Sequence, residues 1–327
     1  MRELDLLSRI YDRSKDLSTA FPQVLVGPGD DCAVVRCGSR RVLITTDALV
    51  ESVHFESKWL TPKQLGRRSF LVNASDIAAM GGRPTFCVIS AGVPVSYPAK
   101  DLTALHAGIH AAARECGAAV VGGNISRADR LFISITLLGD APSRAVTRRG
   151  AGVGDELFVT GTLGDAALGV RQLQRRQRGG HAIARYREPQ PRLTAGLLLA
   201  THRLASAMID VSDGLLQDLG HLTQASGIGA EIEVEALPYS PALRRLPKAD
   251  ALQLALRGGD DYELLCAVPR QRVPALQRLQ KRLGCPFTRI GRCVPARNGI
   301  ELLGAGREIR VDGTGGWDHF VSRARDE

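Results

Sequence analysis

Five short acidic motifs, spread along the 327-residue chain, carry the residue types best suited to chemistry. They are Gly29-Asp30-Asp31, Thr45-Thr46-Asp47, Asp76, Asp210-x-Ser212-Asp213-Gly214 and Gly258-Gly259-Asp260-Asp261. Carboxylate and hydroxyl oxygens are the ligands that magnesium prefers, and magnesium keeps waters and substrate phosphates in its remaining positions. A single aspartate beside glycine is more often a turn or a helix cap. Five such motifs together favour a magnesium site.

Two glycine-rich segments could approach a phosphate. Gly122-Gly123-Asn124 follows an apolar run and is either a phosphate-binding turn with exposed backbone amides or a plain tight turn. The segment 161–165 lacks the lysine of a P-loop, and no Gly-Lys pair occurs in the chain, so a P-loop nucleotide site is excluded. We therefore expect residues 161–165 to mediate helix-to-sheet packing.

Other reactive side chains give weaker signals. His54 follows the run that contains Asp47, and its simplest interpretation is a strand-end residue. Trp317 follows two glycines and is most simply a tail residue that pins the chain to the core. No Ser/His/Asp or Cys/His arrangement at a recognisable spacing supports acyl transfer.

The elements that position the first motifs follow from hydrophobic periodicity and turn residues. We expect a helix over about 3–15, strands over 32–37 and 41–50 joined by a turn at Gly38-Ser39, a helix over 61–80, a strand over 85–94, a helix over 99–116, and strands over 118–123 and 131–139. The helix over 61–80 opens with Thr61-Pro62, a cap followed by a first-turn proline, and delivers Asp76 near its end.

The second half repeats this alternation after a stretch of mixed Pro, Gly, Ser and Arg at 140–155, where we place the domain boundary. We expect a strand over 156–161, a helix from Asp165, a helix over 192–207, a loop over 208–214, a helix over 214–226, a strand over 230–237, a helix over 250–256, a strand over 261–269 and a helix-strand pair to about 294. Interleaved strands and helices predict an α/β fold with layered α+β character and mixed sheets. The predicted domains are 1–140 and 150–327.

Composition narrows the class of protein. The chain has 43 basic and 34 acidic residues, a net charge of +9, and 44% hydrophobic residues, as expected for a folded globular protein. The arginines are scattered and aromatic residues are few, which argues against nucleic-acid binding. One dense block, 171–187, is either a solvated loop or helix face or, less simply, a binding arm.

Compartment and partners follow from what the chain lacks. Its seven cysteines form no Cys-x-x-Cys pair, which indicates neither a disulfide framework nor a zinc knuckle. No apolar run reaches the roughly 18 residues that a membrane span needs, and the N-terminal residues do not form a signal sequence. We expect a cytoplasmic protein with no membrane partner.

Taken in order, the motifs resemble a known family. VGPGDDCAVV, LITTDALVESVHF, NASDIAAMGGRP, VVGGN, AVTRRGAGVGDELFVTG, MIDVSDGL, GGDDYELL and GWDHF are similar to thiamine-monophosphate kinases, which belong to the aminoimidazole ribonucleotide synthetase superfamily. The resemblance covers nearly the whole chain. The Gly-Asp-Asp and Asp-x-Ser-Asp-Gly motifs are shared across the superfamily, whereas Gly-Gly-x-Asp-Tyr-Glu-Leu and Gly-Trp-Asp-His-Phe are more specific to these kinases.

The resemblance implies ATP-dependent phosphorylation of thiamine phosphate to thiamine diphosphate, assisted by several magnesium ions. It also implies a homodimer whose N-terminal mixed sheets, which bind ATP and magnesium, form the interface, with a C-terminal α/β sandwich in each subunit. By matching position, the implied metal ligands are Asp30, Thr45, Thr46, Asp47, Asp76, Asn124, Asp210 and Asp213. The implied ATP contacts are Gly123, Asn124, Arg148 and Ser212, and the implied substrate contacts are His54, Asp260 and Trp317. The family usually has aspartate where this chain has Asn124, so one negative charge is missing at that position.

The implied chemistry agrees with the residues. The phosphate of the acceptor is already anionic near neutral pH, so direct in-line transfer requires no general base and no catalytic residue in that sense. It requires magnesium and an arginine to hold two polyanions together. A thiazolium cation suits an aromatic face and a carboxylate, the roles implied for Trp317 and Asp260. Two alternatives stay open: another ATP-dependent enzyme of the superfamily acting on a different small substrate, and a non-enzymatic basic nucleotide- or RNA-binding protein, whose binding would fall steeply with salt.

Overall fold

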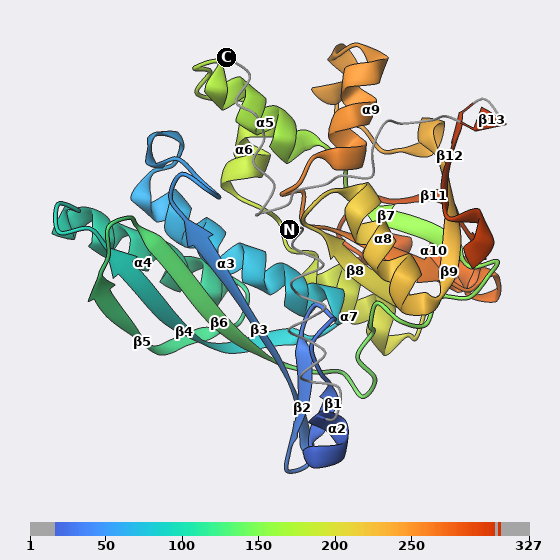
Figure 1. The fold of residues 1–327 in the computed structure, drawn as a ribbon, viewed down its shortest axis with the longest axis horizontal. Coiled ribbons are helices and arrows are strands. Elements are labelled where there is room, and N and C mark those ends of the chain that lie inside the picture. The colour runs from blue at the N-terminus through green and yellow to red at the C-terminus, as the bar shows by residue number, and fades with distance from the viewer. Residues whose placement is uncertain (1–16, 305–306, 309–327) are drawn as a thin grey trace.

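The computed structural model describes residues 17–304 and 307–308. The helix expected over 3–15 and the residue Trp317 lie outside these ranges. Within them the chain forms two mixed sheets with helices packed on them, which confirms the predicted two-domain α/β architecture (Figure 1). No helix in the described ranges combines the length and the apolar composition that crossing a membrane requires.

The first sheet has six strands and lies in the N-terminal part of the chain. In spatial order they are β1 (Val24–Val26), β2 (Ala33–Cys37), β3 (Arg40–Val50), β6 (Phe132–Asp140), β4 (Arg83–Val93) and β5 (Ala119–Arg127), and the short helix α2 (Leu17–Ala20) precedes β1. The β4–β5 pair is parallel and the other pairs are antiparallel. The sheet is therefore mixed, as predicted. One expectation is wrong: Gly122-Gly123-Asn124 forms no tight turn, because β5 continues through it, paired with β4.

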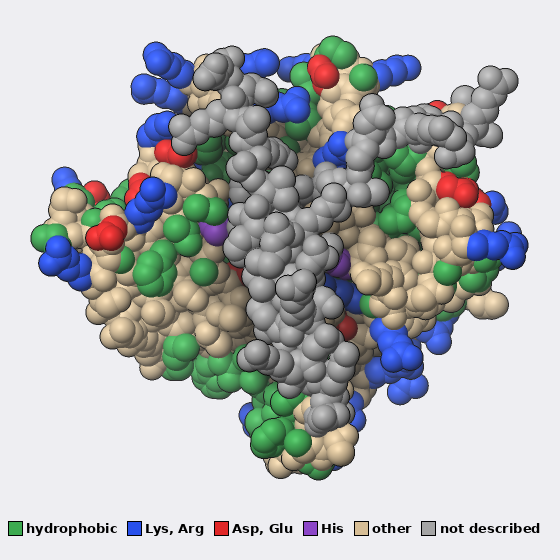
Figure 2. All heavy atoms as spheres, viewed as in Figure 1, with side chains coloured by type: hydrophobic (Ala, Val, Ile, Leu, Met, Phe, Trp, Pro, Cys, Tyr) green, Lys and Arg blue, Asp and Glu red, His purple; other side chains and the backbone are tan. Residues whose placement is uncertain are grey.

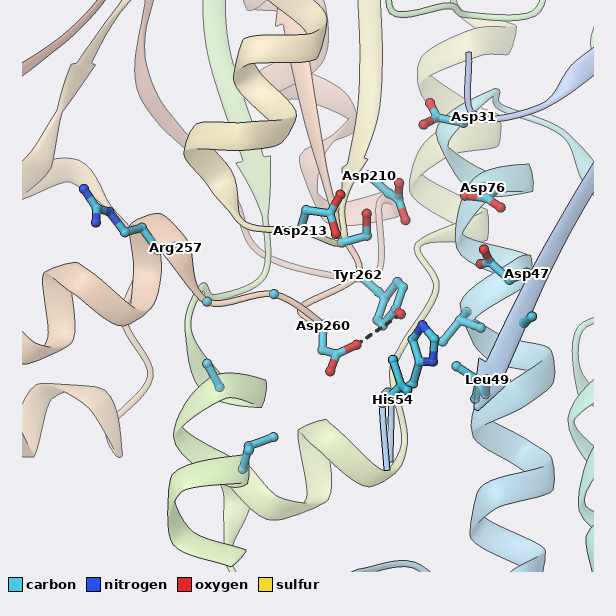
Figure 3. Close-up of a pocket in the computed structure, with 18 of the residues that line it drawn as sticks. Asp31, Asp47, Leu49, His54, Asp76, Asp210, Asp213, Arg257, Asp260 and Tyr262 are labelled. Atoms are coloured by element: carbon cyan, nitrogen blue, oxygen red, sulfur yellow. Dashed lines mark hydrogen bonds between the residues drawn. The ribbon is translucent and has the colours of Figure 1, made fainter. Parts of the chain in front are cut away.

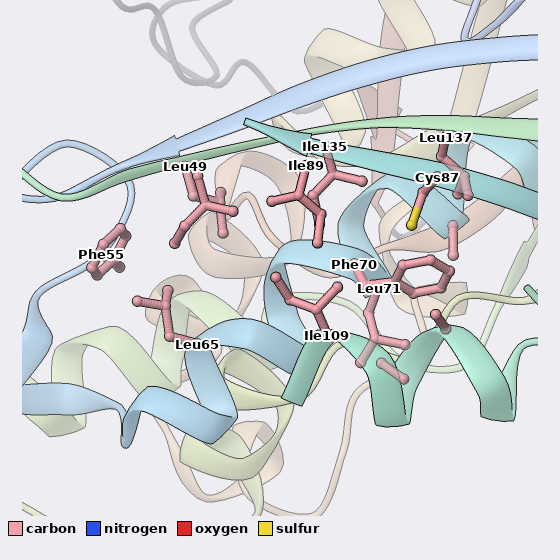
Figure 4. Packing of buried hydrophobic residues seen from close by; sticks show 14 of the residues in the cluster. Leu49, Phe55, Leu65, Phe70, Leu71, Cys87, Ile89, Ile109, Ile135 and Leu137 are labelled. Atoms are coloured by element: carbon pink, nitrogen blue, oxygen red, sulfur yellow. The ribbon is translucent and has the colours of Figure 1, made fainter. Parts of the chain in front are cut away.

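Helices α3 (Pro62–Ala79) and α4 (Ala99–Glu115) cover one face of this sheet (Figure 1). The start of α3 is the capping box that Thr61-Pro62 predicts: the Thr61 side chain accepts from the Gln64 N–H, and the Gln64 side chain accepts from the Thr61 N–H. Between helices and sheet lies an apolar core (Figure 4). On the sheet's other face Phe86 and Val88 are 51% and 40% exposed, although both are apolar.

The second sheet has seven strands and lies in the C-terminal part. In spatial order they are β13 (Arg307–Glu308), β12 (Ile300–Gly304), β9 (Ile228–Glu233), β11 (Phe287–Pro295), β7 (Glu156–Thr160), β10 (Glu263–Val268) and β8 (Ala207–Val211). Its helices are α5 (Asp165–Gln174), α6 (His181–Arg187), α7 (Leu193–Thr201), α8 (Leu215–Ser226), α9 (Lys248–Arg257) and α10 (Val273–Leu279). Single 3₁₀ turns lie at Ser57–Trp59, Val234–Ala236, Leu243–Arg245, Arg270–Arg272, Gln280–Arg282 and Ala296–Asn298.

Two expectations in this half are wrong. The prediction of a loop over 208–214 is wrong, because Ala207–Val211 is the fully buried strand β8, paired with β10. A short apolar run that is buried on both faces has no alternation, so its periodicity did not identify it as a strand. The helix expected over 192–207 also ends early, at Thr201, because the chain must turn before entering β8.

Helix α3 joins the two halves of the molecule, because it packs on the first sheet and also contacts β8 and α7. Gly196 in α7 makes the close approach possible: a Cβ there would lie 2.0 Å from the carbonyl oxygen of Ala78 in α3. The segment 161–165 is expected to pack a helix against the sheet, but at Gly164 it packs against a helix. A Cβ on Gly164 would lie 2.8 Å from the backbone of α9.

The arginines do not form one basic patch on the face shown in Figure 2, where Lys and Arg side chains are distributed around the rim. Within the block 171–187, Arg171 and Arg175 are exposed, as expected of a solvated helix face. Arg185 departs from that expectation. Its side chain is 8% exposed and its Nη2 donates to Glu263 Oε1 at 2.7 Å in the interior.

Candidate active site

A cavity of about 730 Å³ lies where the two domains meet (Figure 3). Its walls come from β3 and α3 on one side, and from β8, α5, α9 and the segment 258–262 on the other. The cavity brings together most of the residues predicted from the sequence: Asp30, Thr45, Thr46, Asp47, His54, Asp76, Arg148, Asp210, Ser212, Asp213 and Asp260. Neither domain supplies the whole set.

A cluster of three carboxylates forms one end of the cavity. Ligand oxygens of Asp31, Asp76 and Asp210 lie within 4.8 Å of one another, although the residues belong to three separate motifs. Two hydroxyls orient the cluster: Thr45 Oγ1 donates to Asp76 Oδ2 at 2.5 Å, and Ser75 Oγ donates to Asp210 Oδ2 at 2.6 Å. Figure 3 shows the three carboxylates on neighbouring elements at the same side of the cavity.

Burial and mutual repulsion disfavour the charged forms of these acids. Burial, with the neighbouring Asp31 as the next cause, raises the pKa of Asp30 and that of Asp210 to about 7. Burial and then the carboxylates of Asp47 and Asp210 raise the pKa of Asp76 well above its ordinary value. Without a cation, the cluster must therefore hold protons near neutral pH.

The cluster fits a magnesium ion. Its donors are oxygens only, and Asp31 Oδ2 is buried with no hydrogen-bond partner, so it is an orphaned acceptor. A divalent cation among the three carboxylates would satisfy that oxygen and favour their charged forms. Asp47, at the surface of the same cavity, could add a further oxygen; its backbone N–H donates to Asn73 Oδ1 at 3.0 Å, which fixes β3 against α3.

Arg148 lies at the edge of the cluster. Its Nη2 and Nε donate to Asp31 Oδ1 at 2.6 and 3.1 Å, and its backbone N–H donates to Asp30 Oδ2 at 3.2 Å. The charge of Arg148 offsets part of the repulsion, but burial still raises the pKa of Asp31. This arrangement places a guanidinium beside the carboxylates, where it can hold an anionic oxygen.

Asp218, which the sequence analysis did not single out, holds the Asp-x-Ser-Asp-Gly loop in shape. Its Oδ2 accepts from the backbone N–H groups of Ser212, Asp213 and Gly214 at 3.0 to 3.1 Å. Asp218 is 2% exposed in the first turn of α8, where a carboxylate also suits the helix dipole. The sequence feature that could have identified Asp218 is its position five residues after Asp213, in the first turn of the helix that follows the motif.

The far end of the cavity carries the implied substrate contacts. Asp260 and His54 both line it, and Tyr262, which the sequence analysis did not predict as a site residue, lies between them in Figure 3. His54 Nδ1 accepts from the backbone N–H of Val50 at 3.1 Å, which fixes the orientation of the ring. Asp261, the second acid of its motif, is structural instead: its carboxylate accepts the N–H groups at the start of α5.

Gly123 and Asn124 are not part of this cavity. They line a second hollow of about 380 Å³, bordered by β5 and α4 and by His106 and His110. The order of the sheet explains the separation, because β6 and β4 lie between β3 and β5. Three strand spacings correspond to about 14 Å.

Comparison with known proteins identifies the family. The family model for AIR synthase related protein, N-terminal domain, matches residues 29–141, and the model for the C-terminal domain matches residues 152–302. The thiamine-monophosphate kinase of Salmonella typhimurium is 37% identical over 330 residues, which cover 98% of each chain. The chain belongs to the thiamine-monophosphate kinase family. It is therefore an enzyme of the kinase class.

Solved structures agree with this membership of the thiamine-monophosphate kinase family. The structure of AaThiL complexed with AMPPCP and TMP matches with a TM-score of 0.80 and 32% identity, covering 98% of this chain and 99% of that one. The thiamine-monophosphate kinase from Stenotrophomonas maltophilia K279a matches with a TM-score of 0.76 and 35% identity, covering 91% and 96%. The two-domain fold is thus that of the family.

Proposed function

We propose that this protein transfers a phosphoryl group from ATP directly to the phosphate of thiamine phosphate, in line and with the help of several magnesium ions. The observation that carries the proposal is a single cavity with the carboxylate cluster at one end and Asp260 and His54 at the other. Family membership supports both substrates, since AaThiL was solved with AMPPCP and TMP together.

The carboxylate end would hold the metal ions. The proposed ligands are Asp30, Thr45, Thr46, Asp47, Asp76, Asp210 and Asp213, together with Asp31, which the cluster adds. Bound magnesium supplies positive charge that neutralises the two polyanions and the transferring group. Arg148 would contribute its guanidinium to the ATP phosphates, and Ser212, in the loop fixed by Asp218, would contribute a further contact.

No side chain in this scheme acts as a general base. The attacking oxygen belongs to the acceptor's own phosphate, whose second pKa is about 6, so it already carries charge near neutral pH. The protein has to bring two anions together and to exclude water, a task of positioning and electrostatics. At the far end, the Asp260 carboxylate would contact the cationic part of thiamine phosphate, and His54 would border the same group. Trp317 is proposed as a further substrate contact.

We also propose that the enzyme is a homodimer formed through the uncovered face of the N-terminal sheet. Phe86, Val88 and Val121 of β4 and β5 are 40% to 60% exposed, an apolar area that a second copy would bury. Asn124 pairs in register with Ser90 on β4. In such a dimer Asn124 and Gly123 would reach the nucleotide of the partner subunit rather than that of their own, which reconciles their implied ATP contact with their distance from the cavity.

A product assay tests the proposed function. Purified protein with ATP, magnesium and thiamine phosphate should yield ADP and thiamine diphosphate in equal amounts. Omission of magnesium should abolish both products, and thiamine in place of thiamine phosphate should give none. If neither product forms while another phosphate acceptor of similar size is consumed with ATP, the substrate assignment is wrong and another activity of the superfamily replaces it.

A further inference from the structure

Arg68, in the middle of α3, is one of the most buried side chains of the protein, although the implied ligand and substrate contacts do not include it. Its side chain is 1% exposed. Arginine is rarely buried to this extent unless it is paired, because taking its charge out of water is costly. A buried arginine on a helix of the N-terminal domain therefore needs a partner, and the partner is in the other domain.

Arg68 and Tyr262 donate to the same carboxylate oxygen of Asp260, an implied substrate contact. Arg68 Nη2 donates to Asp260 Oδ1 at 2.6 Å, and the hydroxyl of Tyr262 donates to the same oxygen at 3.2 Å. The guanidinium also lies over the ring of Tyr186, 4.5 Å from the ring centroid, and Nη1 donates to the Tyr186 carbonyl. Asp260 itself is not buried, since its side chain is 32% exposed at the cavity.

The backbone at Asp260 and Tyr262 has an unfavourable conformation that contacts with neighbouring segments must stabilise. Asp260 and Tyr262 have φ angles of 71° and 51°, in the left-handed region that non-glycine residues rarely adopt. The N–H of Asp260 donates to the Ser212 carbonyl at 2.7 Å, and that of Tyr262 donates to the Val211 carbonyl at 2.8 Å. These bonds fix the main chain, whereas the bond from Arg68 fixes the carboxylate.

We propose that Arg68 is the positioning residue of the substrate end: it holds Asp260 Oδ1 so that the second oxygen of the carboxylate faces the cavity and receives the cationic part of thiamine phosphate. This role rests on the proposed function. Tyr186, which Arg68 contacts, also donates its hydroxyl to the His54 carbonyl at 3.4 Å. One buried guanidinium thus connects both implied substrate contacts to α3.

Replacement of Arg68 should raise the KM for thiamine phosphate and leave the KM for ATP unchanged. In Arg68→Met the Asp260 carboxylate loses its strongest donor and can rotate, so we expect the KM for thiamine phosphate to rise about 10- to 100-fold, the range expected when a hydrogen bond to a charged group is lost. The KM for ATP should stay within about twofold. Arg68→Lys keeps a charged donor in reach of Asp260 and should restore most of the affinity.

Arg67 provides a matched control on the same helix. It also forms ion pairs, to Glu115 and Glu188, but none of these three residues lines the cavity. Arg67→Met therefore makes the same substitution as Arg68→Met, with the same loss of charge and the same shortening of the side chain. It should leave both KM values unchanged.

A double variant decides whether Arg68 acts through Asp260. Asp260→Asn alone should raise the KM for thiamine phosphate, and Arg68→Met added to it should cause little further rise, because the two changes interrupt one contact. If the two effects multiply in full, or if Arg68→Met raises both KM values alike, Arg68 has no positioning role. If Arg68→Met does not fold, Tyr262→Phe, which removes the second donor to the same oxygen, should still raise the KM for thiamine phosphate a few-fold; an unchanged KM would overturn the proposal.

Product formation by the wild-type protein distinguishes a failure of the positioning role from a failure of the proposed function. If wild-type protein makes no thiamine diphosphate, the proposed function fails and the role of Arg68 falls with it. If wild-type protein makes the product and the Arg68 variants behave like the Arg67 control, only the positioning role is wrong.

Discussion

The crowding of three carboxylates predicts that replacing one of them should stabilise the protein and abolish its activity. Asp76 shares the cluster with Asp31 and Asp210, with ligand oxygens within 4.8 Å of one another. Asp76→Asn keeps the shape of the side chain and an oxygen that can still accept from Thr45 Oγ1. It removes one negative charge from a place where burial and the neighbouring carboxylates raise the pKa of Asp76.

The magnitude follows from the spacing of the charges. Two ionised carboxylates whose ligand oxygens lie within 4.8 Å of one another repel by at least about 3 kcal/mol at an effective dielectric constant near 20. Arg148 offsets part of this through Asp31, and partial protonation of the cluster relieves more. We therefore expect Asp76→Asn to raise the free energy of unfolding of the metal-free protein by about 1–3 kcal/mol at pH 8, or about 1.5 °C in Tm for each kcal/mol in a chain of this length.

The stability that the cluster contributes depends on pH. Asp76 and Asp210 have folded-state pKa values above their unfolded values, that of Asp210 at about 7, so the folded state binds more protons than the unfolded state between pH 4 and 7. Their contribution to stability is present at low pH and lost as the pH rises through these values. The advantage of Asp76→Asn should accordingly be small at pH 5 and largest at pH 8.

Thermal unfolding in a chelator and in excess magnesium measures these effects. Magnesium should raise the Tm of the wild type at pH 8 and raise that of Asp76→Asn much less, and turnover of the variant should fall at least about 100-fold. Asp129→Asn, which removes one charge from an exposed bend, should change neither quantity. If Asp76→Asn is less stable than the wild type in chelator, or if its response to magnesium is unchanged, the cluster is structural and the reasoning is refuted.

Two further predictions concern the cavity surface and the sheet. Asp47→Asn and Asp213→Asn should each lower turnover by about 100-fold or more without lowering the temperature of unfolding, because both side chains line the cavity and neither is needed to hold its neighbours; a large loss of stability in both would show that they are structural caps. Phe86→Glu should convert the proposed dimer to a monomer in light scattering with little change in unfolding, because Phe86 is 51% exposed in one chain; an unchanged mass would exclude this sheet face as the interface.

The aspartates could be predicted from the sequence because their neighbours are distinctive. Glycine, serine and threonine around each acid mark the ends of elements, and Asp76 was placed correctly near the end of its helix. Periodicity also identified most helices and strands, including the capped start of α3. Local sequence carries this information because caps, turns and amphipathic faces are local interactions.

The pairings between distant residues could not be predicted. Arg68 and Asp260 are 192 positions apart, and Arg185 and Glu263 are 78 apart, so no spacing links them. An arginine in a basic helix is usually solvated, and only the packed interior shows that Arg68 and Arg185 are not. The position of Asn124 depends on the order of strands in the sheet, which a single strand's sequence does not encode.

Helix α3 ties the two ends of the cavity to one rigid element. Arg68 contacts Asp260 at the substrate end, and seven residues later Ser75 contacts Asp210 at the carboxylate end. Seven residues are nearly two helical turns, so both side chains project to the same face about 10 Å apart. The helix thereby sets the distance between the proposed site for cations and the proposed site for a cationic substrate, and it does so with residues that bind partners in the other domain. A one-residue insertion between Arg68 and Ser75 would rotate one end by about 100° relative to the other, which should disrupt both ends of the site even though each domain could keep its own core.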